Sequence, residues 1–115
     1  MKQYSISNEE HVITIDIEQI EEDKLKFKLI FKNNDIAFDM DEIATNLDPE
    51  GMAALKEFDP SGEDNAMEMY IYSTSEYYIM ILIPLVDADI DYIGLSIRNS
   101  NDKYLFDGML IHNDV

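Results

Sequence analysis

The chain contains no cysteine and no tryptophan, and it has only four glycines and three prolines. The absence of cysteine excludes disulfides, thiolate metal sites and cysteine nucleophiles. The scattered glycines form no phosphate-binding loop, and the serines form no nucleophile elbow. Because no catalytic motif is present, we predict a protein that is not an enzyme and that needs no cofactor.

Long apolar runs are also absent. The longest strongly apolar stretch spans residues 77–86, which is ten residues and about half of what a membrane-spanning helix needs. Residues 1–5 contain no apolar segment typical of a signal peptide. We therefore expect a cytoplasmic protein without membrane contact. Seven tyrosines, five phenylalanines and a hydrophobic content of 46% predict one packed domain over residues 1–115.

Positive charge is scarce, with 8 basic residues against 25 acidic ones and a formal net charge of -17. Residues 1–34 have a net charge of only -2, whereas residues 35–115 have a net charge of -15. Such a charge repels nucleic acid and anionic lipid, and it attracts basic proteins and multivalent cations. It also opposes self-association, so we expect a monomer when the protein is free.

An amino-terminal hairpin is the clearest local pattern. Apolar and polar residues alternate over residues 13–17 and again over residues 25–31, as in half-buried strands. Because the odd-numbered residues are apolar in both runs, directly opposed residues must have numbers that sum to an even value. This condition requires a loop with an odd residue count, most simply the three residues 21–23.

The same register predicts how the hairpin handles its charge. It places Asp16 opposite Lys28 and Glu18 opposite Lys26, and each such pair contributes roughly 0.2–1 kcal/mol. The lysines of the hairpin are thereby neutralised locally.

Further elements follow from similar patterns. Strands are predicted at residues 36–40, 67–72, 77–85, 90–98 and 104–112, with a β-bulge at Gly94 where the alternation shifts phase. Residues 77–85 are apolar on both faces, which predicts a central strand covered above and below. A helix is predicted to begin after Asp48 as its N-cap and to run over residues 49–58, with residues 42–47 as an additional helical turn. We therefore predict an α+β fold: a mostly antiparallel sheet of six or seven strands with one principal helix packed on one face.

The segment 35–64 is the leading candidate for a binding surface, because it contains ten acidic residues and one basic residue. A solvated face explains part of this composition, but surfaces normally intersperse both signs of charge. A field of one sign accelerates encounter with an oppositely charged partner. The candidate residues are Asp35, Asp39, Asp41, Glu42, Asp48, Glu50, Glu63 and Asp64.

A second candidate is the alternating stripe Asp87, Asp89 and Asp91. It matches the start of a calcium loop, but Tyr92 stands where that loop needs glycine and Arg98 where it needs glutamate. On an extended chain these acids are about 6.6 Å apart, a spacing suited to sites that a nuclease reserves for phosphates. The alternative is a solvated strand edge protected by its charge.

Tyrosines and histidines complete the candidates. Tyr70 and Tyr72 lie near acidic residues, a composition typical of interface hot spots, although packing within a sheet is the alternative. His11 and His112 would approach each other if the terminal strands paired, but no metal-binding spacing involves them.

We therefore predict a non-enzymatic acidic inhibitor that binds and neutralises a basic protein. The leading hypothesis is an immunity protein that blocks the nucleic-acid site of a cognate nuclease toxin, because such a site must be positively charged. One alternative is a phage-type DNA mimic directed against a restriction or CRISPR protein. A second alternative is a divalent-cation-binding module.

Overall fold

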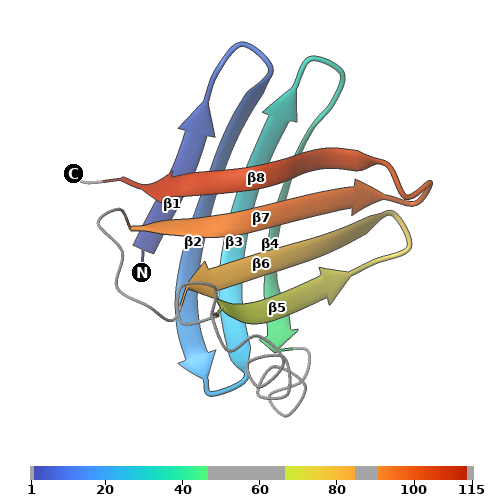
Figure 1. The fold of residues 1–115 in the computed structure, drawn as a ribbon. Coiled ribbons are helices and arrows are strands. Elements are labelled where there is room, and N and C mark those ends of the chain that lie inside the picture. The colour runs from blue at the N-terminus through green and yellow to red at the C-terminus, as the bar shows by residue number, and fades with distance from the viewer. Residues whose placement is uncertain (1, 47–66, 85–90, 114–115) are drawn as a thin grey trace, which may run out of the picture.

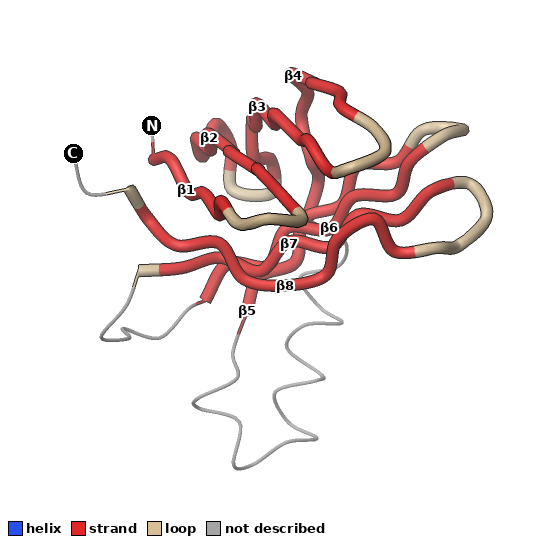
Figure 2. Tube along the Cα trace, turned by 90° about the horizontal axis from the view of Figure 1, so that it is seen from above, coloured by secondary structure: helices blue, strands red, loops and turns tan. Residues whose placement is uncertain are grey.

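In the part of the chain that the structure describes, the fold consists of eight antiparallel strands joined in sequence order (Figure 1). The computed structural model describes residues 2–46, 67–84 and 91–113. Each strand pairs with the next, and the last pairs with the first, which closes a barrel (Figure 2). The strands are β1 (Lys2–Ser7), β2 (His11–Glu21), β3 (Lys24–Asn33), β4 (Ala37–Asn46), β5 (Met67–Ser73), β6 (Tyr77–Pro84), β7 (Tyr92–Asn99) and β8 (Tyr104–His112).

The barrel is made of two four-stranded halves, β1–β4 and β5–β8, whose strands cross at a steep angle (Figure 1). Two short seams join the halves. Among the described residues, β4 pairs with β5 only through Thr45 and Asn46, and β1 pairs with β8 only through Tyr4 and Ser5. The strands within each half pair over most of their length, as in sandwiches whose sheets pack orthogonally.

Apolar side chains fill the interior, as expected for a barrel of eight strands. The largest fully buried residues are Tyr70, Phe27, Phe31, Ile13, Ile15, Leu25, Leu29, Ile79, Ile81, Ile93, Leu95 and Ile97. Burial of one such aliphatic or aromatic side chain contributes about 1.5–3 kcal/mol. Phe38 stacks between Phe31 and Tyr77, with ring centroids 4.9 and 4.5 Å apart, and so links β4 to β6 across the interior.

The predicted register of the first hairpin is confirmed. Asp16 lies opposite Lys28, and Glu18 lies opposite Lys26. The predicted three-residue loop is wrong in detail: β2 extends to Glu21, and the turn contains only residues 22 and 23. A bulge between Gln19 and Glu21 supplies the extra residue that the register requires.

The predicted α+β class is wrong, because every regular element in the described part of the chain is a strand and the number of strands is eight. The helix predicted at residues 49–58 and its cap Asp48 lie outside the described residues. The helical turn predicted from residue 42 is wrong as far as Asn46. There, β4 continues because Ile43, Ala44 and Thr45 pair with residues 24–26 of β3.

The strand β1 was missed because its alternation is short. Tyr4 is buried and Ile6 is half-buried against the core, and both are flanked by polar residues. The pairing of β1 with β2 and β8 on its two sides completes the barrel. A run of six residues with two inward side chains carries too little periodicity to be recognised without those neighbours.

The bulge predicted at Gly94 is absent, because β7 pairs with β8 without interruption from Tyr92 to Ile97, and Gly94 itself pairs with Leu82 of β6. The irregularity of β7 lies instead between Ile97 and Arg98, in the pairing with β8. A Cβ atom added to Gly94 would lie 3.1 Å from Leu82 Cβ. Glycine is therefore needed for the close approach of the Leu82 side chain and not for a bulge.

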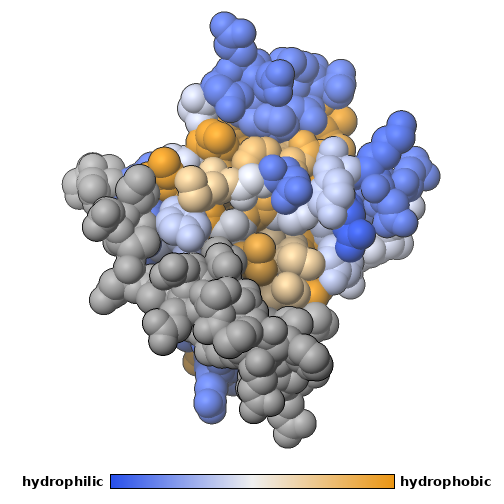
Figure 3. Space-filling model, viewed as in Figure 1, coloured by the Kyte–Doolittle hydropathy of each residue, from blue (hydrophilic) through white to orange (hydrophobic). Residues whose placement is uncertain are grey.

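The strand β6 is fully covered on only one of its two apolar faces. Ile79 and Ile81 are buried in the barrel, whereas Met80 and Leu82 on the outer face are half-buried. Figure 3 shows hydrophobic side chains on this outer face of the second half, bordered by hydrophilic ones. The two-sided hydrophobicity of residues 77–84 thus reflects one face in the core and one face of an apolar outer surface.

Candidate functional site

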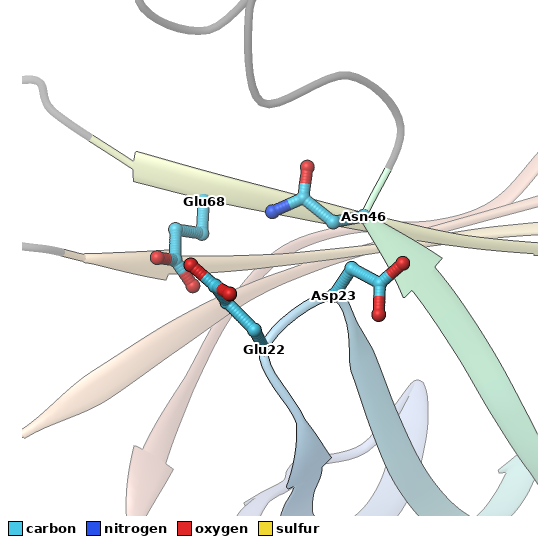
Figure 4. A pocket seen from close by; sticks show the side chains of 4 residues that line it. All are labelled: Glu22, Asp23, Asn46 and Glu68. Carbon is cyan, nitrogen blue, oxygen red and sulfur yellow. The ribbon is translucent and has the colours of Figure 1, made fainter.

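Carboxylates gather at the end of the barrel where β2 turns into β3 and where β4 ends and β5 begins. Glu22 and Asp23 form the turn, and Glu68 follows the first residue of β5. These residues and Asn46 line an open pocket of about 480 Å³ (Figure 4). In this view the carboxylates of Glu22 and Glu68 point toward one another, and that of Asp23 points away. We name Glu21, Glu22, Asp23 and Glu68 the acidic end.

A buried tyrosine orients Glu68. Tyr70 has no exposed surface, and its hydroxyl donates a hydrogen bond of 2.8 Å to Glu68 Oε2. The same hydroxyl lies 3.2 Å from Gln19 Oε1, and Gln19 Nε2 donates to the carbonyl oxygen of Lys24 at 3.1 Å. Burial, followed by the hydrogen bond to Glu68, raises the pKa of Tyr70. The core of the barrel thereby holds one carboxylate of the acidic end in place.

Backbone pairing closes this end of the barrel. The backbone N–H of Asn46 donates to the carbonyl oxygen of Asp23 at 2.8 Å, which ties the end of β4 to the β2–β3 turn. Lys24 Nζ lies 3.6 Å from Glu21 Oε2, the one ion pair at this turn among the residues that the structure describes. The other carboxylates of the acidic end therefore have no cationic partner within the described residues.

The predicted acids in β4 and in the turn before it are exposed, and one of them lies opposite a lysine of the first hairpin. Asp39 and Asp41 are exposed on the outer face of β4, and Asp35 lies in the turn before it. Asp41 lies opposite Lys28, which Asp16 faces from the other side. Lys28 is consequently shared between the acids of β2 and β4.

The predicted tyrosines point into the barrel. Tyr70 is buried, as described above, so its side chain does not lie on the surface. Tyr72 is half-buried and packs edge-on against Phe27, with ring centroids 5.6 Å apart. Its partial desolvation and the nearby Glu42 carboxylate raise the pKa of Tyr72. Glu42 thus lies at the inner side of β4, beside Tyr72, and is nevertheless exposed.

Asp91 forms a separate cluster at the β1–β8 seam. Its carboxylate accepts hydrogen bonds from Tyr4 at 2.8 Å and from Lys2 at 3.2 Å, and it lies 3.8 Å from His112 Nδ1. Partial desolvation raises the pKa of Asp91, but the bonds from Tyr4 and Lys2 outweigh it and lower the pKa overall. Burial and Asp91 raise the pKa of Tyr4 in turn.

Six of the predicted acids lie outside the described residues: Asp48, Glu50, Glu63, Asp64, Asp87 and Asp89.

The two histidines lie in different surroundings. His11 Nε2 is 3.0 Å from the carbonyl oxygen of Leu105, and the His11 ring packs edge-on against Phe106. His112 packs against Tyr4 and lies beside Asp91. Each histidine is therefore part of local packing at its own strand end.

Sequence reasoning missed the acidic end as a site. It assigned residues 21–23 to a loop and Glu68 to the polar side of a strand, although three consecutive acids at a turn were a visible signal. The turn lies close to the start of β5 only because of the path that β4 takes. Local periodicity gives no information about that path.

Comparisons of the chain with protein-family models, with curated proteins and with solved structures found no match. The fold and the site therefore define a class only: a closed, eight-stranded antiparallel barrel with one acidic end. Among the described residues, no helix is long and apolar enough to cross a membrane. Within the same residues, no three histidine, aspartate or glutamate side chains are grouped so that they could hold a metal ion.

Proposed function

We propose that the chain is a non-enzymatic acidic inhibitor of a basic protein, and that it acts as an immunity protein against a nuclease toxin. The observation that carries this proposal is the acidic end, where Glu22, Asp23 and Glu68 line an open pocket with little compensating positive charge. A nuclease needs a positive groove for phosphate, and carboxylates held on a rigid fold can occupy such a groove.

The geometry of the acidic end favours this function over a nucleic-acid mimic. A nucleic-acid mimic needs acids along an elongated surface, whereas the acids of the acidic end lie together at one end of the barrel. Tyr70 and the Asn46–Asp23 backbone bond hold that end rigidly. A preorganised site loses little conformational entropy on binding, which favours a tight complex.

The net charge of the chain also favours a basic protein as the partner. A net charge of -17 speeds association with a basic protein and slows association with nucleic acid or with a second copy.

A nuclease assay tests the proposal. The protein encoded by the gene next to that of this chain is tested for cleavage of DNA or RNA with and without the purified chain, over a range of salt concentrations. We expect inhibition whose association rate falls as salt rises, because screening weakens the attraction between exposed charges. The absence of inhibition at low salt would contradict the proposal.

A matched pair of variants tests the position of the site. The double variant Glu22→Gln with Asp23→Asn should associate about threefold to tenfold more slowly. The control, Asp16→Asn with Glu18→Gln, removes the same charge from the same residue types, but its residues lie opposite lysines. Equal effects of the two double variants would show that the acidic end is not the contact surface.

A further inference from the structure

Within the described residues, one edge of β4 has no paired neighbouring strand over most of its length. Nine residues of β4, from Ala37 to Thr45, pair with β3 on one side. On the other side, in the part of the chain that the structure describes, pairing with β5 involves only Thr45 and Asn46. We name residues 37–44, on the side away from β3, the β4 edge. Figure 1 shows β5 leaving the end of β4 at a steep angle.

The direction of the backbone groups along the β4 edge follows from the pairing with β3. Asn33 N–H donates to the carbonyl oxygen of Ile36, and Asn46 N–H donates to that of Asp23, so even-numbered residues form hydrogen-bonded pairs with β3 at both ends. Hydrogen-bonded and non-bonded pairs alternate along an antiparallel ladder. The odd-numbered residues Ala37, Asp39, Asp41 and Ile43 therefore direct their N–H and C=O groups away from β3.

The side chains of the β4 edge are accessible. Asp39, Asp41 and Ile43 are exposed, and Ile43 retains 46% of its accessible surface. Glu42 is exposed on the inner side, next to Tyr72. Phe38 and Met40 are half-buried and pack against the core, so they hold the strand in position.

The composition of the edge selects its partner. Residues 37–44 contain no proline, lysine or arginine, which commonly protect exposed edges from pairing. They contain three acids, Asp39, Asp41 and Glu42. Acids on two facing copies of the same edge would repel each other, whereas acids facing lysine or arginine would attract. The charge thus disfavours a second copy and favours a basic strand.

We propose that the β4 edge binds an extended segment of the basic partner, rich in lysine or arginine, as an added strand. The backbone of Asp39, Asp41 and Ile43 supplies the hydrogen bonds, and the carboxylates of Asp39, Asp41 and Glu42 select basic side chains. This inference rests on the proposed function for the nature of the partner, and it adds the surface and the mode of recognition.

Amide exchange with a peptide tests the added strand. The probe is a short synthetic peptide in which lysine alternates with valine, added to the full chain at low salt. We expect slower hydrogen exchange at the amides of Asp39, Asp41 and Ile43 and no change at Met40 and Glu42, whose amides already pair with β3. Absence of protection at the odd-numbered amides despite peptide binding would overturn the proposal.

A second peptide separates strand addition from attraction between charges. Its sequence is the same, but alternate backbone nitrogens on one edge are methylated and cannot donate hydrogen bonds. Because each lost hydrogen bond weakens binding, the methylated peptide should bind at least about threefold to tenfold more weakly than the unmethylated one. Equal affinities of the two peptides would show that charge alone is responsible, and would also overturn the proposal.

A variant of the protein tests the same contact from the other side. Ile43→Pro removes one N–H group of the β4 edge without changing the charge or breaking a bond to β3, and proline is tolerated on such an edge. The control Ile43→Thr keeps the N–H group. We expect the proline variant to bind the lysine–valine peptide about threefold to tenfold more weakly than the threonine variant. Equal binding by two folded variants would overturn the proposal.

Other occupants of the edge are distinguishable in the same experiments. Protection of Asp39, Asp41 and Ile43 that grows with protein concentration without peptide would assign the edge to a second copy and overturn the proposal. Protection in the free chain at every concentration would show that the chain covers its own edge, with the same consequence. Because the peptide experiments contain no nuclease, failure to inhibit a nuclease contradicts only the proposed function.

Discussion

Asp41 lies directly opposite Lys28 on the neighbouring strand of the barrel. Asp16 faces the same lysine from β2. Lys28 therefore has an acidic residue opposite it on each side, and the division of charge between residues 1–34 and 35–115 does not correspond to two separate surfaces. Among the described acids, Glu22, Asp23 and Glu68 of the acidic end have no cationic partner, and Asp39 lies opposite Ile30 on β3.

The pairing of Asp41 with Lys28 predicts a difference between two otherwise similar substitutions. Asp41→Asn should lower the free energy of unfolding by about 0.2–1 kcal/mol relative to Asp39→Asn, because Asp39 faces Ile30 and loses no attraction. Urea denaturation at low salt measures both variants. The difference should diminish at high salt, since screening weakens exposed pairs. Identical stabilities at low salt would contradict this account.

The lowered pKa of Asp91 predicts a dependence of stability on pH. A carboxyl whose pKa is lower in the folded state stabilises the fold above its unfolded pKa, about 3.9, and this contribution is lost as pH falls through the folded pKa. Asp91→Asn should therefore be less stable than the wild type at neutral pH, and the difference should shrink on acidification.

Urea denaturation at several pH values measures the Asp91 effect. Asp102→Asn serves as the control, because Asp102 is an exposed turn residue whose ion pair with Arg98 is 3.9 Å long. Asn also tolerates the positive φ of 60° at this position. A difference between the wild type and Asp91→Asn that stays constant with pH would refute the role of ionised Asp91.

The buried Tyr70 predicts an effect at alkaline pH. Tyr70→Phe removes the hydrogen bond to Glu68 and should lower the free energy of unfolding by about 1 kcal/mol at neutral pH. The raised pKa of Tyr70 means that its contribution is complete below the unfolded pKa, about 10, and is lost as pH rises above that value.

The alkaline loss of stability should therefore be smaller in Tyr70→Phe than in the wild type. The control is Tyr104→Phe, since Tyr104 is 58% exposed. Thermal unfolding followed by circular dichroism between neutral pH and about pH 11 measures both variants. An equal alkaline loss in Tyr70→Phe and in the wild type would exclude Tyr70 as a source of that loss.

The close approach of Leu82 to Gly94 predicts a packing conflict. Gly94→Ala places a Cβ atom 3.1 Å from Leu82 Cβ and should destabilise the fold by about 1 kcal/mol. Ser96→Ala is the control at the next outward position of β7. Leu82→Ala removes the Cδ1 and Cγ contacts at 3.2 and 3.6 Å and keeps the Cβ contact at 3.1 Å, so adding Gly94→Ala there should lower the free energy of unfolding by less than it does in the wild type. Additive effects in denaturation experiments would contradict this explanation of the glycine.

The predicted elements differ in how far local patterns could specify them. The alternation of residues 13–17 and 25–31 was sufficient for the register, because a slip by one residue would expose every apolar side chain of a strand. The assignment of Gly94 to a bulge failed because a glycine that permits a close side-chain contact has the same local sequence as one that permits a bulge. The acidic residues of β4 could be named as candidates from the sequence. Their neighbours on β3 could not be predicted, because they depend on how far β4 extends.

The sequence by itself determined the alternating strands, the register of the first hairpin and the excess of acidic residues, because the pleat of a strand repeats every two residues and charge depends only on composition. The tertiary structure alone decided that Tyr70 is buried beneath Glu68, that Asp41 shares Lys28 with Asp16, and that β4, within the described residues, pairs with β5 only at its end. The first and third of these features arise where the two halves of the barrel meet, and the second arises where β4 pairs with β3 in the first half. Contacts between residues far apart in the chain depend on how strands twist and close, which no local pattern encodes.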